Sequence, residues 1–302
     1  GVSPEISIVA PMHNEEGNAE PLYRALKEAM GNMGKPYEII FVNDASSDKT
    51  IDILKKLRTS DPLFHYCDLT KNVGENWALL AGVSKARGNI VVTTDGDFQN
   101  DPAFIPDMVR KLDEGYRVVS GWRRRRVGGF FDRILPSVVA NFLISKISGV
   151  AVHDCGCGMK AYRREVLEGK YVPPGGMNRF SPVIFGVKSN EFAEVEVVDR
   201  TRLYGSSHYG IKRIFVVLND LVALPFILQG PKRMKSLVSA FMVFSLLLCV
   251  VFAALGCTGS VFWILASVGC SAVFMACVSV RWNLSRYTDA AASPRFTIKE
   301  FQ

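Results

Sequence analysis

The chain of 302 residues is 48% hydrophobic and 22% charged, with a formal net charge of +7. This length suffices for one large domain, or for a domain with an appendage. The seven cysteines are an odd number and four of them lie in long apolar runs, so neither a disulfide framework nor a zinc site is indicated. The basic residues cluster near apolar segments, which favours anionic membrane lipids over nucleic acid as partners.

The first part of the chain alternates short β-branched runs with helical patterns. Strands are predicted at residues 6–10, 38–42, 90–94 and 117–121. Helices are predicted between them, at residues 19–30, 50–58, 77–86 and 105–114. This alternation predicts an α/β fold with a mostly parallel sheet, in which ligands bind at the carboxyl ends of the strands. No basic and apolar leader precedes the first strand, so we expect the first 200 residues to stay in the cytosol.

Polar segments at residues 13–16, 43–48 and 95–101 directly follow predicted strands, so we expect them to share one rim of the sheet. The third segment carries Asp95 and Asp97, two carboxylates one residue apart. Magnesium or manganese takes one or two protein carboxylates together with phosphate oxygens, so this pair suits a metal-bound diphosphate. The alternative is a solvated acidic turn with Gly96 at the bend.

The other two polar segments offer hydrogen-bonding groups to a nucleoside. Asp44 can accept from donors on a base or a ribose, whereas Ser47 and Asp48 are interpreted as caps of the following helix. Glu15 can bind ribose hydroxyls, and His13 is interpreted as incidental.

Two long runs near the C-terminal end, at residues 236–257 and 260–280, contain no charged residue. Each approaches the roughly 20 apolar residues that span a bilayer as a helix. We predict two transmembrane helices within residues 234–282, rather than buried helices of a soluble protein. Basic residues flank the pair on both outer sides, which predicts cytoplasmic flanks. Residues 283–302 are predicted to be a polar, loosely structured cytoplasmic tail.

Residues 130–150 and 211–228 are apolar on one side at helical spacing, and Pro225 is expected to bend or break the second helix. Core-facing helices would show the same pattern, but the nearby arginines and apolar runs favour interfacial helices. The predicted organisation is therefore a catalytic domain at 1–208, juxtamembrane helices at 209–233, the hairpin at 234–282 and the tail.

Four ordered motifs carry a family resemblance: S-I-V-A-P-x-x-N-E-E at residues 7–16, V-N-D-A-S-S-D at 42–48, K-N-x-G at 71–74 and D-G-D-F-Q-N-D-P at 95–102. Together they resemble the family-two glycosyltransferases, which have the Rossmann-like GT-A fold. One branch is resembled more closely, through the motifs G-W-R at 121–123, A-N at 140–141, S-G at 148–149 and D-x-G-C-G-M-K-A-Y-R-R at 154–164, together with Arg133. This branch is the polyprenyl-phosphate glycosyltransferases, relatives of bactoprenol glucosyltransferase and dolichol-phosphate mannose synthase.

The resemblance implies a donor site at the rim of the sheet. The implied nucleotide-binding residues are Pro11, Asn14, Glu15, Asp44, Gly74 and Asp95. Asp95 and Asp97 would handle the donor diphosphate and a metal ion, and Gln99 would be a further metal ligand. Asp97 is the residue that we expect to be indispensable.

The resemblance also implies a site for the acceptor phosphate. Its implied residues are Arg123, Arg133, Arg202, Ser207 and His208, of which Arg202 is also counted with Asp95, Asp97 and Asp154 as catalytic. His208 stands where the family has lysine, so its protonation could make activity depend on pH. Asp154 would lie near the acceptor. A phosphate monoester, with a second pKa of about 6, is already an anion at neutral pH, so Asp154 could orient Arg or Lys side chains instead of acting as a base.

The expected reaction is an inverting transfer of sugar from a nucleotide-sugar to polyprenyl (undecaprenyl) phosphate, with Mg²⁺ or Mn²⁺ as cofactor. UDP-glucose or another UDP-hexose is favoured, and the product would serve cell-envelope glycan modification. The alternatives are a GDP-mannose-dependent mannose synthase, a catalytically degenerate nucleotide-binding membrane partner, a transporter subunit and a processive synthase. We expect a multi-pass protein of the cytoplasmic membrane with its catalytic domain facing the cytoplasm, which could form a homo-oligomer such as a tetramer.

Overall fold

The structure is a computed structural model that describes the chain except for residues 1–2, 125–134, 169–179, 199–211, 258–259 and 293–294. The chain divides into two compact units. The first consists of Gly1–Lys212 and Pro294–Gln302, and the second of Arg213–Ser293. The first unit contains residues 1–208, which the sequence predicts as one domain, and also takes in residues from beyond the predicted hairpin.

The first unit is built on a sheet in the order β7-β5-β6-β4-β1-β2-β3-β8. The strands are β1 (Ile6–Met12), β2 (Tyr37–Asn43), β3 (Phe64–Leu69), β4 (Ile90–Thr93), β5 (Val118–Trp122), β6 (Lys160–Arg163), β7 (Phe192–Glu196) and β8 (Ile298–Phe301). Only β6 and β8 run antiparallel to their neighbours among the described strands. We call β4, β1, β2, β3 and β8 the β1 half of the sheet, and β6, β5 and β7 the β5 half.

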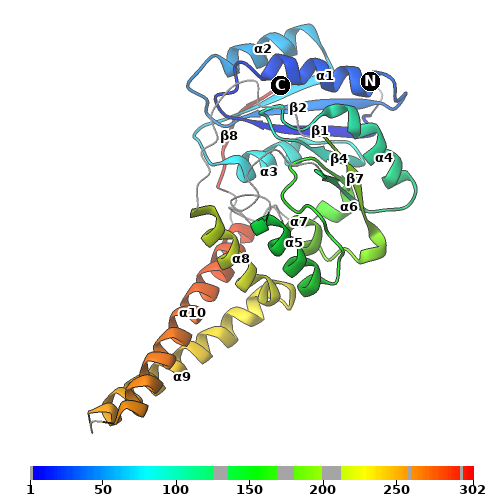
Figure 1. Cartoon of the computed structure of the whole chain (residues 1–302). Helices are drawn as coiled ribbons and strands as arrows, with labels where there is room; N and C mark the ends of the chain where they lie inside the picture. The colour runs from blue at the N-terminus through cyan, green and yellow to red at the C-terminus, as the bar shows by residue number, and fades with distance from the viewer. Residues whose placement is uncertain (1–2, 125–134, 169–179, 199–211, 258–259, 293–294) are drawn as a thin grey trace. The chain divides into compact units, whose positions relative to one another are not determined.

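Helices cover both faces of the β1 half (Figure 1). The helices of the first unit are α1 (Ala19–Gly31), α2 (Thr50–Ser60), α3 (Glu75–Lys85), α4 (Ile105–Asp113), α5 (Leu135–Ser148), α6 (Arg164–Leu167) and α7 (Ser181–Ile184), with 3₁₀ turns at Pro102–Phe104 and Ser189–Glu191. Because strand side chains alternate, Ile8 and Ala10 face the cluster formed with α1, α2 and α4, while Val9 faces α3. This layering leaves the strand ends free to carry polar loops.

The prediction that residues 283–302 are loosely structured is wrong. Helix α10 continues to Ala292, and residues 298–301 form β8, which pairs antiparallel with β3 at the edge of the sheet. Phe296, Ile298 and Phe301 pack against the core cluster on the α3 face, so burial of these apolar side chains holds the segment in place.

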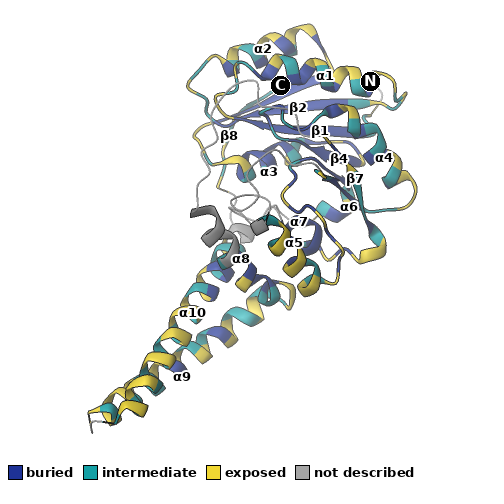
Figure 2. Ribbon diagram, viewed as in Figure 1, coloured by how far each residue is buried: buried dark blue, intermediate teal, exposed yellow. Residues whose placement is uncertain are grey.

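The second unit consists of α8 (Lys212–Leu228), α9 (Pro231–Gly256) and α10 (Val261–Ala292). Pro225 lies inside α8 without ending it, so the helix does not break there, which was one of the two outcomes expected from the sequence. Pro231–Gly256 and Val261–Asp289 are long and apolar enough to cross a membrane. Figure 2 shows exposed residues along both helices, as expected where lipid rather than protein would cover them. They form a candidate transmembrane hairpin.

Candidate active site

Three loops at the carboxyl ends of β1, β2 and β4 contain unusual backbone. Asn14, Ala45 and Phe98 have φ values of 57°, 50° and 58°, and they are the only non-glycine residues with positive φ in the described part of the chain. Such conformations cost energy and tend to persist at functional sites, where the surroundings hold them. The sequence prediction that these three polar segments share one rim agrees with the parallel registers of β1, β2 and β4.

The first two loops are held together by side-chain hydrogen bonds. The backbone N–H of Asn14 donates to Ser46 Oγ at 3.0 Å, and the side-chain Oδ1 of Asn14 accepts from the backbone N–H of Ser47 at 2.8 Å. Asp48 accepts from the backbone N–H of Thr50 at 3.0 Å, but the N-cap position of α2 is Lys49, which makes no side-chain capping bond, so the predicted caps Ser47 and Asp48 do not occupy that position. Glu15 accepts from Asn18 Nδ2 at 2.6 Å, so its carboxylate is already partly engaged within its own loop.

Asp44 organises the loop that leads into α3. Its two carboxylate oxygens accept from the backbone N–H groups of Val73 and Gly74 at 2.8 and 2.9 Å, and the residue is buried. Gly74 adopts a φ of 89°, which a side chain would strain. A carboxylate has capacity for further hydrogen bonds, so Asp44 can hold this loop and still accept from a ligand.

His13, which the sequence interpretation set aside, lies between two motifs of the rim. Its Nδ1 is 2.8 Å from the Asp44 carbonyl oxygen, and Asn72 Nδ2 is 3.1 Å from the ring nitrogens. A signal for this role was its position inside the first motif, two residues after Pro11. Pro11 itself is a buried β1 residue whose carbonyl oxygen abuts Gly96 so closely that a Cβ there would clash.

The aspartate pair lies at the end of β4. Asp95 Oδ2 accepts from Asn100 Nδ2 at 3.0 Å, and Asp97 Oδ1 accepts from the Gln99 N–H at 3.1 Å. Removal from water raises the pKa of the Asp95 carboxyl, and the charge of Asp97 raises it further. A divalent cation at this place would offset both causes, so the donor set fits one.

No group of three or more His, Cys, Asp or Glu side chains in the described ranges is arranged to hold a metal by itself. Two carboxylates and an amide nevertheless suit Mg²⁺ or Mn²⁺ when substrate phosphates complete the coordination. The fit therefore depends on a phosphate-bearing substrate.

The aspartate pair is packed directly against the β5 half. The position of a Cβ on Gly158 would overlap the Asp95 carboxylate, and Cys157 Sγ lies 3.5 Å from Asn100 Oδ1. Burial raises the pKa of the Cys157 thiol to about 12, so this sulfur stays protonated and unreactive. These contacts place the D-x-D and D-x-G-C-G motifs side by side.

Asp154 and Arg123 form a bidentate ion pair. Arg123 Nε and Nη2 donate to the two carboxylate oxygens of Asp154 at 2.8 and 3.1 Å, and the Arg123 backbone N–H donates at 3.2 Å. The Asp154 side chain is 2% exposed, but that of Arg123 is 19% exposed. The carboxylate is thus enclosed, whereas the arginine side chain is partly exposed.

Glu194 on β7 holds the backbone of residues 153 and 154 in place. Its carboxylate accepts from the backbone N–H groups of His153 and Asp154 at 3.0 and 3.1 Å. The ring of His153 stacks on Trp122 with centroids 4.5 Å apart. Neither contact could be predicted from sequence, because the partners are far apart along the chain. The predicted residues Arg133, Arg202, Ser207 and His208 lie outside the described residues.

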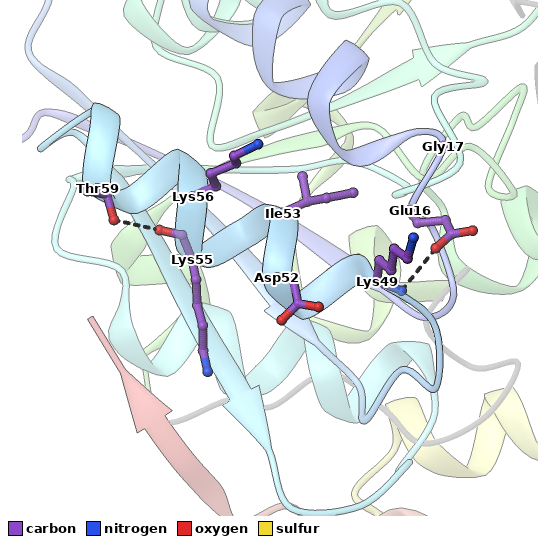
Figure 3. A pocket seen from close by; sticks show the side chains of 8 residues that line it. All are labelled: Glu16, Gly17, Lys49, Asp52, Ile53, Lys55, Lys56 and Thr59. Atoms are coloured by element: carbon purple, nitrogen blue, oxygen red, sulfur yellow. Dashed lines mark hydrogen bonds between the residues drawn. The ribbon is translucent and has the colours of Figure 1, made fainter.

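A separate pocket is lined by residues of α2 and of the segment before α1 (Figure 3). Its lining residues are Glu16, Gly17, Lys49, Asp52, Ile53, Lys55, Lys56 and Thr59. Neither aspartate of the D-x-D motif nor the Arg123–Asp154 pair contributes to it, and its charges are of both signs. We therefore assign the chemistry to the strand ends and not to this pocket.

Comparison with known proteins agrees with this geometry. Residues 7–169 match the domain described as Glycosyl transferase family 2. A dodecaprenyl-phosphate galacturonate synthase of Rhizobium johnstonii is 38% identical over 233 residues, covering 76% of this chain and 69% of that protein. An undecaprenyl-phosphate 4-deoxy-4-formamido-L-arabinose transferase of Pseudomonas paraeruginosa is 31% identical over 307 residues, covering 97% of this chain and 89% of that protein.

Among solved structures, glucosyl-3-phosphoglycerate synthase from Mycobacterium tuberculosis, in complex with Mn²⁺, UDP and glucosyl-3-phosphoglycerate, has a TM-score of 0.55 at 20% identity. The match covers 74% of this chain and 79% of that one, and it shows a shared GT-A fold. The domain match and the close relatives establish more than the fold. The chain belongs to glycosyl transferase family 2 and is a glycosyltransferase.

Proposed function

We propose that this protein transfers a sugar from a nucleotide-sugar to polyprenyl phosphate. The observation that carries the proposal is the direct packing of the Asp95 carboxylate on the loop that holds the Arg123–Asp154 pair. This packing brings a site suited to a metal-bound diphosphate next to a guanidinium suited to a phosphate. The names of the relatives, which specify dodecaprenyl and undecaprenyl phosphate, support a lipid phosphate as the acceptor.

Asp95, Asp97 and Gln99 would hold Mg²⁺ or Mn²⁺ on the donor side. When bound, the ion neutralises the negative charge that develops on the departing nucleoside diphosphate. Asp44 and Asn14 hold the loops around the nucleoside, since each bonds to a neighbouring loop at the same rim. The nucleoside diphosphate in the neighbouring structure is UDP, which favours a UDP-sugar, with a GDP-sugar as the alternative.

Arg123 would bind the acceptor phosphate, together with Arg133, Arg202, Ser207 and His208. Its planar guanidinium stays charged and can bind phosphate oxygens while Asp154 holds the group from behind. Both oxygens of Asp154 already accept from Arg123, so this carboxylate orients the arginine and does not act as a base. No catalytic base is needed, because a phosphate monoester, with a second pKa of about 6, is already ionised at neutral pH.

The reaction is a single in-line displacement. A phosphate oxygen of the lipid forms a bond to the anomeric carbon while the bond from that carbon to the diphosphate oxygen breaks, with inversion. Positioning of the two phosphate groups and neutralisation of their charge supply the catalysis. The candidate transmembrane hairpin would anchor the enzyme in the cytoplasmic membrane, with the catalytic unit facing the cytoplasm and a homo-oligomer as its assembly.

The test measures transfer of radiolabelled sugar to undecaprenyl phosphate in detergent with Mg²⁺ or Mn²⁺. The donor panel contains UDP-glucose, the UDP derivatives of galacturonate and 4-deoxy-4-formamido-L-arabinose, and GDP-mannose. We expect transfer from one UDP-sugar that Asp97→Ala or a chelator abolishes. The matched control is Asp107→Ala, which removes an exposed aspartate paired with Arg110 on α4 and leaves transfer unchanged. Absence of transfer from every donor would favour a nucleotide-binding partner protein without catalysis.

A further inference from the structure

Helix α5 presents two chemically different sides. Its exposed apolar side chains include Val138 at 58%, Val139 at 47% and Phe142 at 59% exposure. On its other side, Asn141 and Ile144 are buried against the first unit. Apolar residues on an exposed helix favour contact with lipid, whereas a buried asparagine requires hydrogen-bond partners. The partners of Asn141 are therefore informative.

Asn141 bonds to the backbone on both sides of Asp154. Its Nδ2 donates to the His153 carbonyl oxygen at 2.5 Å, and its Oδ1 accepts from the Cys155 N–H at 3.3 Å. One side chain thus satisfies a backbone acceptor and a backbone donor two residues apart. This arrangement fixes the path of the peptide that carries Asp154.

Ser145, one turn further along α5, extends the contact. Its Oγ accepts from the Val152 N–H at 3.0 Å and lies 3.2 Å from the Val152 carbonyl oxygen. Residues at spacing i and i+4 share a face of a helix, so both polar side chains bond to the same stretch, residues 152–155. Glu194 holds the same stretch from β7. Asp154 is therefore held by α5 and by the sheet.

We propose that Asn141 is a positioning residue for the acceptor site. It sets the position of Asp154, and Asp154 in turn sets the orientation of the Arg123 guanidinium. Because α5 also carries the exposed apolar side chains, the acceptor arginine is tied to the helix that would face the lipid. This inference rests on the proposed function, since it assigns Arg123 to the lipid phosphate.

The experiment compares Asn141→Leu with Ser148→Ala. Leucine branches at Cγ as asparagine does, but it carries neither donor nor acceptor and so removes both hydrogen bonds. Ser148 lies on the same helix, and its Oγ bonds to the Ile144 carbonyl oxygen and the Val150 N–H, outside the stretch around Asp154. Three quantities are measured: kcat/KM for undecaprenyl phosphate, the Kd of UDP with Mn²⁺, and amide hydrogen exchange of residues 152–157.

We expect Asn141→Leu to lower kcat/KM for the lipid by about 10- to 100-fold, as displacement of a substrate-positioning group does. The Kd of UDP should change by less than about twofold, because Asn141 bonds to His153 and Cys155, whereas the contacts with Asp95 and Asn100 come from Gly158 and Cys157, further along the loop. Exchange should become faster in residues 152–157 and stay unchanged in residues 69–74. Ser148→Ala should match the wild type in all three measurements. A merely structural role would lower stability without separating acceptor kinetics from donor binding.

Wild-type kinetics and wild-type exchange in Asn141→Leu would overturn the inference while leaving the proposed function intact. A wild-type protein that transfers no sugar would refute the proposed function, and the acceptor role of Asn141 with it. If Asn141→Leu does not fold, Asn141→Asp decides, because it keeps the acceptor for the Cys155 N–H and loses the donor to His153. Unchanged kcat/KM for the lipid in that variant would also overturn the inference.

Discussion

The β1 half and the β5 half of the sheet hold their functional side chains in different ways. In the β1 half, Asp44 bonds to two neutral backbone N–H groups, and Asn14 bonds to the loop after β2. In the β5 half, Asp154 is instead neutralised by a full positive charge on Arg123. The first arrangement places negative charge at the rim, whereas the second pairs a buried carboxylate with a guanidinium. In the proposed function the first takes a cation and the second an anion.

The largest effect is expected from Asp154→Ala, which breaks the arrangement in the β5 half. Removing one partner of a buried ion pair costs several kcal/mol; because Arg123 keeps some exposure, we expect about 3 kcal/mol, the lower end of the range. Loss of the oriented guanidinium should also lower transfer to undecaprenyl phosphate by about 100-fold. Thermal unfolding in detergent and transfer kinetics measure the two effects.

A double-mutant cycle with Arg123→Ala separates the pair from its parts. The double variant should be less destabilised than the sum of the single variants, because neither charge is then left without its partner. Additive losses of stability would contradict the claim that Asp154 and Arg123 stabilise each other as an ion pair.

The second prediction concerns the contact between the halves. In Gly158→Ala the new methyl group meets the Asp95 carboxylate, which must move because a side chain gives way more easily than a backbone. We expect Mn²⁺-dependent binding of UDP to weaken by about tenfold or more, equivalent to roughly 1.4 kcal/mol. Isothermal titration measures this change. Gly31→Ala is the control, because nothing lies within 4 Å of that position. Unchanged binding in Gly158→Ala would show that Asp95 tolerates displacement.

Strands β1, β2, β4 and β5 were predicted from the sequence, whereas β3, β6, β7 and β8 were not. Strands β1, β2 and β4 are short apolar runs followed by polar motifs, so both the sheet and its rim could be located. β3 was missed because it contains His65 and Asp68, polar residues that are buried through partners on other strands. Sequence spacing gave no sign of those partners.

The ion pair illustrates the same limit. Arg123 and Asp154 were each placed at the acceptor by resemblance, but their hydrogen bonds arise only because β5 and the loop before β6 meet in the folded sheet. β8 was missed for a related reason. Its partner β3 is more than 200 residues away in sequence, beyond both apolar helices.

The third prediction tests the β1 half through Asp44→Asn. An amide offers one acceptor oxygen, so only one of the Val73 and Gly74 N–H groups keeps its partner. An unsatisfied buried group costs about 1–3 kcal/mol, so the affinity for UDP with Mn²⁺ should fall by about tenfold. Transfer at saturating donor should remain near the wild-type rate. Asp52→Asn, on the exposed side of α2, is the control. A larger loss at saturating donor than in Asp154→Ala would reverse the comparison between the halves.

The smallest effect is expected from Lys299→Ala. This variant breaks the ion pair between Lys299 and Asp68, which is the pair in the β1 half to compare with Arg123–Asp154. Lys299 Nζ lies 3.3 Å from Asp68, whose side chain is 6% exposed, but the lysine side chain itself is 66% exposed. Asp68 also keeps the hydrogen bond from Asn43 Nδ2 at 2.7 Å, so the variant does not leave it without a partner. An exposed ion pair contributes about 0–1 kcal/mol, and added salt should shrink this further. Thermal unfolding at low and high salt measures it. A loss as large as that of Asp154→Ala would mean that burial of the carboxylate alone sets the energy; a small loss would mean that exposure of the cation decides it.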